Sequence, residues 1–99
     1  SDTQVKLRGY RIDTTEIESH VKKIEGINYC YCYLSKKLRE SHLVLLCLIN
    51  LKDINEIKIL SHLKKHLPNY MIPKKIVIEK KLKFNKNGKV DKTFYKSKY

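Results

Sequence analysis

One lysine stands where a turn would present it to a partner. The pair Asn87-Gly88 directly precedes Lys89, and Val90 and Asp91 follow. Asn-Gly pairs adopt positive φ at low cost, so this pair is typical of a tight turn that holds the next side chain at its tip. A lysine presented in this way could enter a pocket on another domain and neutralise a carboxylate and a phosphate together. The simpler interpretation is an exposed turn that takes no part in chemistry.

Two histidines, His62 and His66, have the i, i+4 spacing that places both imidazoles on one face of a helix. No glutamate stands where a metalloprotease needs one, and the sequence offers no third ligand. We therefore interpret them as surface histidines and predict no metal site. His20 and His42 stand apart from this pair.

Three cysteines, Cys30, Cys32 and Cys47, lack the Cys-x-x-Cys spacing of a redox or metal pair. Cys30 and Cys32 lie in an alternating, strand-like segment, so both thiols should point to one face as small hydrophobic side chains. Free thiols in a reducing compartment follow from this pattern, and we expect a cytoplasmic protein. The sequence also contains no Gly-x-Ser-x-Gly, no phosphate-binding loop and no carboxylate pair in a cleft-like segment, so it lacks the parts of a complete active site.

The formal net charge is +12 in 99 residues, which would suit nucleic acid or another acidic partner. Only three of the 22 basic residues are arginine, however, and lysine does not form the bidentate contacts that arginine makes with phosphates and bases. A solvated basic surface explains the charge, and we do not expect nucleic acid as a partner.

The length and the hydrophobic fraction of 41% suit one small domain over residues 1–99. The longest apolar run, Leu43–Ile49, is too short to span a bilayer. No charged-then-apolar leader opens the sequence, so we expect neither a signal peptide nor a membrane partner.

Hydrophobic periodicity predicts two main helices. The first should begin with a capping box of Thr15 and Glu18 and end at Gly26, and the second should begin at Asp53 with Glu56 and end before Pro68. The expected buried positions are Ile17, Val21 and Ile24 in the first helix and Ile54, Ile57, Leu60, Leu63 and Leu67 in the second.

Alternating or continuous apolar residues predict three strands, at Tyr29–Leu34, Leu43–Ile49 and Ile76–Ile78. The run Leu43–Ile49 is typical of a central strand covered on both faces. A short helical tail should follow, with Val90 and Phe94 on one face. The expected fold is α+β: a small three-stranded, mainly antiparallel sheet flanked by helices, with an extended N-terminal hinge arm over Asp2–Ile12.

Three ordered segments carry a family resemblance. They are Asp2-x-Gln4-Val5-Lys6-Leu7-Arg8-Gly9-Tyr10-Arg11-Ile12, then Leu67-Pro68-Asn69-Tyr70-Met71-Ile72-Pro73, then Asn87-Gly88-Lys89-Val90-Asp91-Lys92. Together they resemble the C-terminal lid subdomain of the adenylate-forming ligases, and are most like amino-acid adenylation enzymes such as D-alanine–carrier protein ligases. The family's large N-terminal domain has no counterpart in this sequence, so we expect an excised domain.

The resemblance implies a role for four residues. Lys89 matches the lysine that contacts the substrate carboxylate and the nucleotide during adenylation. Asp2 matches the hinge about which the lid turns. Gly9 matches the position where the backbone borders the pantetheine arm of the acceptor, and Arg11 matches an arginine near the nucleotide phosphates.

The implied function is that of a lid in an ATP-dependent ligase, which activates a carboxylate, most simply an amino acid, as an acyl-adenylate. The acyl group then passes to a phosphopantetheine thiol on a carrier protein. ATP is the implied cofactor, Mg²⁺ should be held by the large domain, and the partners are that domain and a carrier protein or CoA. The isolated chain should be inactive, and its Asn85–Lys89 loop should be mobile for want of a partner surface. An acyl-CoA synthetase lid and a non-catalytic basic module are the alternatives. The sequence does not identify the activated substrate.

Overall fold

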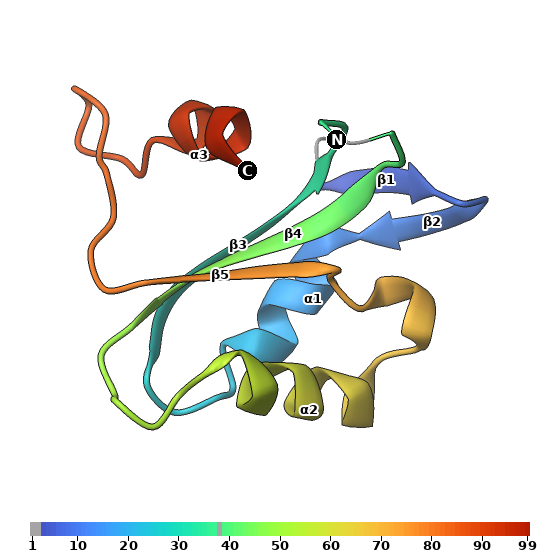
Figure 1. Cartoon of the computed structure of the whole chain (residues 1–99), viewed down its shortest axis with the longest axis horizontal. Coiled ribbons are helices and arrows are strands. Elements are labelled where there is room, and N and C mark those ends of the chain that lie inside the picture. Colours follow the sequence, from blue (N-terminus) through green and yellow to red (C-terminus); the bar gives the residue numbers. More distant parts are fainter. Residues whose placement is uncertain (1–2, 38) are drawn as a thin grey trace.

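A three-stranded sheet lies at the centre of the chain, in the order β3-β4-β5. The strands are β3 (Ile27–Ser35), β4 (His42–Ile49) and β5 (Lys75–Glu79) in a computed structural model that describes residues 3–37 and 39–99 (Figure 1). β3 and β4 pair antiparallel, whereas β4 and β5 pair parallel. The predicted α+β class and the three predicted strands are confirmed. The sheet is mixed rather than mainly antiparallel, because a helix connects β4 to β5 and lets them pair parallel.

β4 is the middle strand and is buried on both faces, as its unbroken apolar run predicted. Leu43, Leu45 and Cys47 pack into the larger hydrophobic cluster, together with residues of the two long helices. Val44 and Leu46 point to the opposite face and join a second cluster under the C-terminal helix. The strand thus separates two small cores.

The N-terminal arm is a β-hairpin of β1 (Gln4–Leu7) and β2 (Tyr10–Asp13), which leads directly into α1 (Thr14–Val21). The N-cap of α1 is Asp13, whose Oδ1 accepts the Thr15 N–H at 3.0 Å. The predicted Thr15–Glu18 capping box is therefore wrong, because the N-cap is Asp13 and the helix begins two residues earlier than that box requires. α1 also ends at Val21, well before Gly26, which lies at the entry to β3.

The second helix, α2 (Glu56–His66), begins after the N-cap Asn55, whose Oδ1 accepts the Lys58 N–H at 2.9 Å. The predicted start at Asp53 is wrong. The buried face consists of Ile59 and Leu63, whereas Ile57, expected in the core, is 77% exposed. Two overlapping apolar periodicities run through this segment, and contact with α1 and the sheet buries the one containing Ile59.

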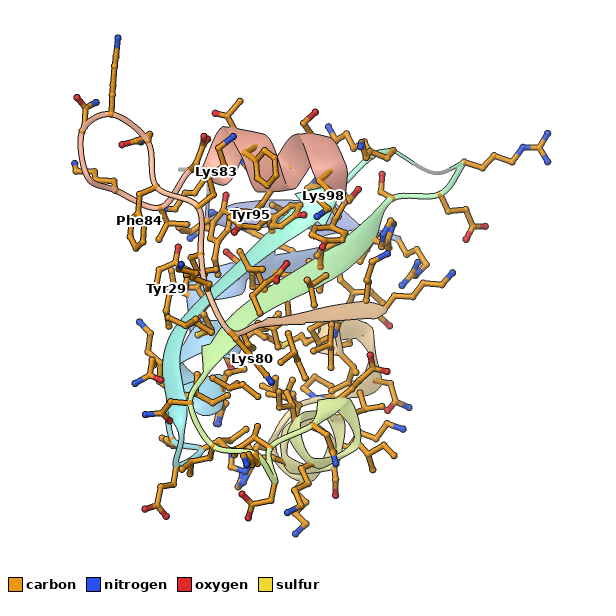
Figure 2. All side chains as sticks on the ribbon, turned by 60° about the vertical axis from the view of Figure 1, so that its left-hand side comes forward. Tyr29, Lys80, Lys83, Phe84, Tyr95 and Lys98 are labelled. Carbon is orange, nitrogen blue, oxygen red and sulfur yellow. The ribbon has the colours of Figure 1, made fainter. Side chains whose placement is uncertain are left out.

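A single 3-10 turn, η1 (Asn69–Met71), follows α2, and the chain ends in α3 (Lys92–Lys98). α3 covers the face of the sheet opposite α1 and α2 (Figure 1). Tyr95 points from α3 toward the sheet (Figure 2), where its hydroxyl accepts the Lys83 N–H at 2.8 Å and its carbonyl accepts the Tyr33 hydroxyl at 3.2 Å. In the described part of the chain, no helix is long and apolar enough to cross a membrane.

Candidate functional site

The loop that carries Lys89 is closed by its own hydrogen bonds. Oδ1 of Asn85 accepts the N–H groups of Asn87 and Lys89 at 2.9 and 3.1 Å, and the Asn85 N–H donates to the Lys89 carbonyl at 2.7 Å. Gly88 occupies the left-handed region at φ +78°, as the Asn-Gly turn predicted. The side chain of Lys89 is exposed, and within the described residues it makes no ion pair.

These bonds contradict the expectation that the Asn85–Lys89 loop needs a partner surface to order it. One asparagine side chain satisfies two backbone donors of the turn, and the bridge between Phe84 and Val90 closes the base of the loop. The turn is therefore defined by its own sequence. Lys89 is presented on a fixed backbone, and only its side chain must move to reach a ligand.

An open cavity of about 520 Å³ adjoins this loop and is bordered by Tyr29, Phe84 and Lys89. Phe84 is 57% exposed, which is unusual for a phenylalanine, and it lies beside the loop on the same side as Tyr29 (Figure 2). The lysine tip therefore stands at the edge of an aromatic surface. The sequence suggested the lysine but gave no sign of this apolar border.

The second predicted position, Gly9, lies at the tip of the β1–β2 hairpin. Arg8 and Gly9 form its two-residue turn, with φ values of +49° and +84°. Paired positive φ values are what a two-residue hairpin turn requires, and glycine meets them at no steric cost. A Cβ placed at Gly9 would meet nothing within 4 Å, so the space above the turn is open.

Arg11 lies on β2 with its guanidinium on the exposed side of the hairpin. Its Nε donates to Oε1 of Gln4 at 2.9 Å, and its Nη2 donates to the same oxygen. Gln4 therefore orients the guanidinium while leaving other N–H donors free for an anion.

The hairpin tip contacts the segment after α2 through two stacked tyrosines. The ring centroids of Tyr10 and Tyr70 are 3.9 Å apart and the rings are inclined by only 9°. Tyr10 belongs to the first and Tyr70 to the second of the three sequence segments that carry the family resemblance, yet the sequence did not predict that they meet. The two residues are 60 positions apart, and local sequence patterns do not predict such long-range contacts.

A second open cavity, of about 540 Å³, adjoins the hairpin and has a cationic border. Arg8, Lys64 and Lys74 line it together with the amide side chain of Asn69, and no carboxylate borders it. Three cations from the hairpin, from α2 and from the segment before β5 thus converge on one hollow. Such a border suits a phosphorylated ligand, and it was missed because its members are far apart in the sequence.

The Lys89 loop and the hairpin tip lie at opposite ends of the molecule along its longest axis (Figure 1). The structure therefore brings Gly9, Arg11 and the cationic cavity to one end and leaves Lys89 at the other. Asp2, the predicted hinge, lies outside the described residues.

The histidines and cysteines considered as metal ligands or nucleophiles have structural surroundings instead. His62 donates from Nε2 to the His20 carbonyl at 3.0 Å, and its ring centroid lies 4.7 Å from that of His66. Among the described residues, no group of three or more His, Cys, Asp or Glu could hold a metal ion. Cys30, Cys32 and Cys47 are buried free thiols, as the alternating pattern predicted for the first two. Burial raises the thiol pKa of Cys30 and of Cys47 to about 12, so neither is a ready nucleophile.

Several lysines around α3 lie over aromatic rings. The ammonium groups of Lys92 and Lys96 are 4.6 and 5.9 Å from the centroid of Tyr31, beside a cavity of about 570 Å³. These are cation–π contacts, in which the ring face attracts the ammonium group.

Comparison with known proteins gives a consistent set of relatives. The chain is 34% identical over 91 residues to gramicidin S synthase 2 of Brevibacillus brevis, and 39% identical over 92 residues to bacitracin synthase 1 of Bacillus licheniformis. Each alignment covers 92% of this chain but only 2% of the relative. No protein-family model matches.

Solved structures share the fold at lower identity. ATP-bound MatB from Rhodopseudomonas palustris superposes with a TM-score of 0.85 at 21% identity, covering 99% of this chain and 20% of that one. A fatty acyl CoA synthetase from Mycobacterium tuberculosis gives 0.82 at 19% identity, covering 98% and 20%. The chain thus corresponds to a small part of much longer proteins.

Proposed function

Because this chain belongs to the adenylate-forming ligases as their C-terminal lid subdomain, we propose that it completes two successive active sites of one such enzyme. The first site joins a carboxylate, here an amino acid, to ATP and releases pyrophosphate. The second transfers the acyl group to the thiol of a phosphopantetheine arm on a carrier protein. The large domain that would hold ATP, Mg²⁺ and the amino acid precedes this chain in the proposed full-length protein.

One observation carries the proposal: the loop that contains Lys89 and the tip of the β1–β2 hairpin that contains Gly9 lie at opposite ends of a single small fold (Figure 1). Both positions cannot face the same substrate in one orientation. A lid that turns between two orientations would present first one end and then the other, and this agrees with a two-step reaction. Asp2 would lie at the pivot in this proposal.

In the first orientation, Lys89 is the residue that acts on the reacting atoms. As a carboxylate oxygen attacks the α-phosphorus, negative charge gathers on the phosphoryl oxygens, and an ammonium group there stabilises the transition state. The self-closed loop supports this role, because its hydrogen bonds hold the backbone and only the side chain of Lys89 must be positioned for the reaction. Phe84 and Tyr29 would cover the site from water.

In the second orientation, the hairpin tip borders the thiol arm. The open space above Gly9 leaves room for a narrow chain, and a side chain there would both obstruct it and strain the turn. The cationic cavity beside the tip would hold the phosphate that links the pantetheine to its carrier. Arg11, oriented by Gln4, would lie near the nucleotide phosphates.

The experiment that tests this function uses the full-length protein that contains this chain. We expect pyrophosphate exchange into ATP with one amino acid of a panel, followed by transfer of that amino acid to a holo carrier protein. Transfer to free CoA instead would assign an acyl-CoA synthetase, since CoA offers the same phosphopantetheine thiol. Absence of exchange with every amino acid and every fatty acid would contradict the proposal.

A further inference from the structure

The stacked pair of Tyr10 and Tyr70 joins the tip of the β1–β2 hairpin to the 3-10 turn η1. We infer that Tyr70 is a positioning residue for the acyl-transfer step, acting through Tyr10 on the hairpin tip. This inference rests on the proposed function and adds to it a residue that touches neither substrate nor nucleotide. Its basis is the parallel stacking of the two rings, with centroids 3.9 Å apart.

The core anchors the two strands of the hairpin unequally near the turn. Leu7, directly before the turn, and Ile12, further along β2, are buried in the main core. Arg8 is exposed, and nothing lies within 4 Å of a Cβ placed at Gly9. Tyr10 is itself 49% exposed, and its contact is the ring of Tyr70. On the β2 side of the turn, where Tyr10 directly follows Gly9, the stack is therefore the packing contact nearest to the turn.

Tyr70 is a suitable support because its own backbone is anchored. It lies in η1, where the Met71 N–H donates to the Pro68 carbonyl at 3.0 Å and the Ile72 N–H donates to the Asn69 carbonyl at 3.1 Å. Met71 and Leu67 are both buried in the main core. The Tyr70 ring thus projects from a turn fixed on either side.

The stack also joins two of the segments that contribute residues to the cationic cavity. Arg8, the residue before Gly9, enters that cavity from the hairpin, while Asn69 and Lys74 enter it from the segment that follows α2. Tyr10 and Tyr70 lie in these same two segments, close in sequence to Arg8 and Asn69, although neither ring lines the cavity. Loss of the stack would let Arg8 and Gly9 drift relative to Lys74, and acyl transfer would slow. Lys89, at the other end of the fold, would be unaffected.

The test measures both half-reactions of the full-length protein with Tyr70→Leu, Tyr10→Leu and the double variant. Aromatic pairs contribute on the order of 1 kcal/mol, so we expect each single variant to slow acyl transfer about fivefold to tenfold. Pyrophosphate exchange should stay within about twofold of wild type. The double variant should transfer no more slowly than either single variant, because removing one ring already removes the stack.

Two further variants separate positioning from general damage. Tyr70→Phe keeps the ring and should restore transfer, whereas Tyr99→Leu, a partly buried tyrosine at the far end of α3, should leave both half-reactions unchanged. Equal losses in exchange and transfer, or additive losses in the double variant, would overturn the inference.

A structural measurement keeps the inference testable if the full-length protein has neither activity, an outcome that would contradict the proposed function alone. In the 99-residue chain, Tyr70→Leu should accelerate backbone amide exchange at residues 8–11 while leaving β4 protected. Unchanged exchange at the hairpin tip would show that the stack does not position it. Tyr10→Leu, altered at an exposed residue, provides the same readout if Tyr70→Leu does not fold.

Discussion

The carboxylate of Glu18 accepts the backbone N–H of Cys32 at 2.8 Å, joining α1 to the outer edge of the sheet. β3 is an edge strand, so its outward N–H groups have no strand partner. Glu18 satisfies one of them from a helix that packs alongside. The residue expected to cap a helix instead protects a sheet edge.

Replacing Glu18 with leucine should therefore destabilise the chain by about 1–3 kcal/mol, because a partly buried N–H loses its acceptor. Glu18→Gln retains an acceptor oxygen and should lose less. Urea unfolding measures the free energies, with Glu25→Gln as an exposed control. A Glu18→Leu variant as stable as wild type would show that water replaces the carboxylate.

The start of α2 gives a second stability prediction. Asn55→Ala removes the acceptor of the Lys58 N–H and should cost about 1 kcal/mol of unfolding free energy. Asp53→Ala, two residues earlier, removes no cap and should be close to neutral. Thermal or urea unfolding of the pair distinguishes the two starts, and a larger loss at Asp53 would restore the start expected from sequence.

The contact between α1 and α2 should make stability depend on pH. The pKa of His62 is lowered from its ordinary value of 6.5, first by desolvation and then by the neighbouring charges of His66, His20 and Lys65. The hydrogen bond to the His20 carbonyl opposes this shift. Because the folded pKa lies below the unfolded one, the unfolded chain binds a proton first as pH falls.

His62 therefore contributes stability that is fully present above its unfolded pKa of about 6.5 and is lost as pH falls through its lower folded pKa. Unfolding measured between about pH 5 and 8 should show this decline. His62→Gln keeps a donor but does not titrate, so its decline should be shallower, and an identical slope would contradict the assignment. Asp13, whose pKa is lowered by its bonds to Thr15, acts only in a more acidic range.

The strands were predictable because their signals are local and unopposed. Leu43–Ile49 offers no helical face, and the alternation around Cys30 and Cys32 has no competing period. The helix ends were harder to predict. Asp13, Thr14 and Thr15 can all cap a helix, and only the pairing of β1 with β2, which ends at Asp13, selects among them. Similarly, Ile57 and Ile59 belong to overlapping periodicities that tertiary packing resolves.

The site was predictable only where it is contiguous in sequence. The turn at Lys89 follows from Asn-Gly, and its internal closure by Asn85 follows from an asparagine placed four residues earlier, a pattern that was overlooked. The stacked Tyr10 and Tyr70 and the cationic cavity around Arg8, Lys64 and Lys74 depend on long-range contacts. No local rule records which distant segments meet.

The measurement that tests the central claim most directly is amino-acid-dependent pyrophosphate exchange by the full-length protein carrying Lys89→Ala. We expect the exchange rate to fall about 100-fold, the scale of removing one preorganised donor from a transition state. Lys86→Ala, an exposed lysine of the same loop, should exchange as wild type does, and both variants should unfold as wild type does. Equal exchange rates for Lys89→Ala and Lys86→Ala would contradict the account, because the turn at Lys89 would then be an exposed loop with no part in the chemistry.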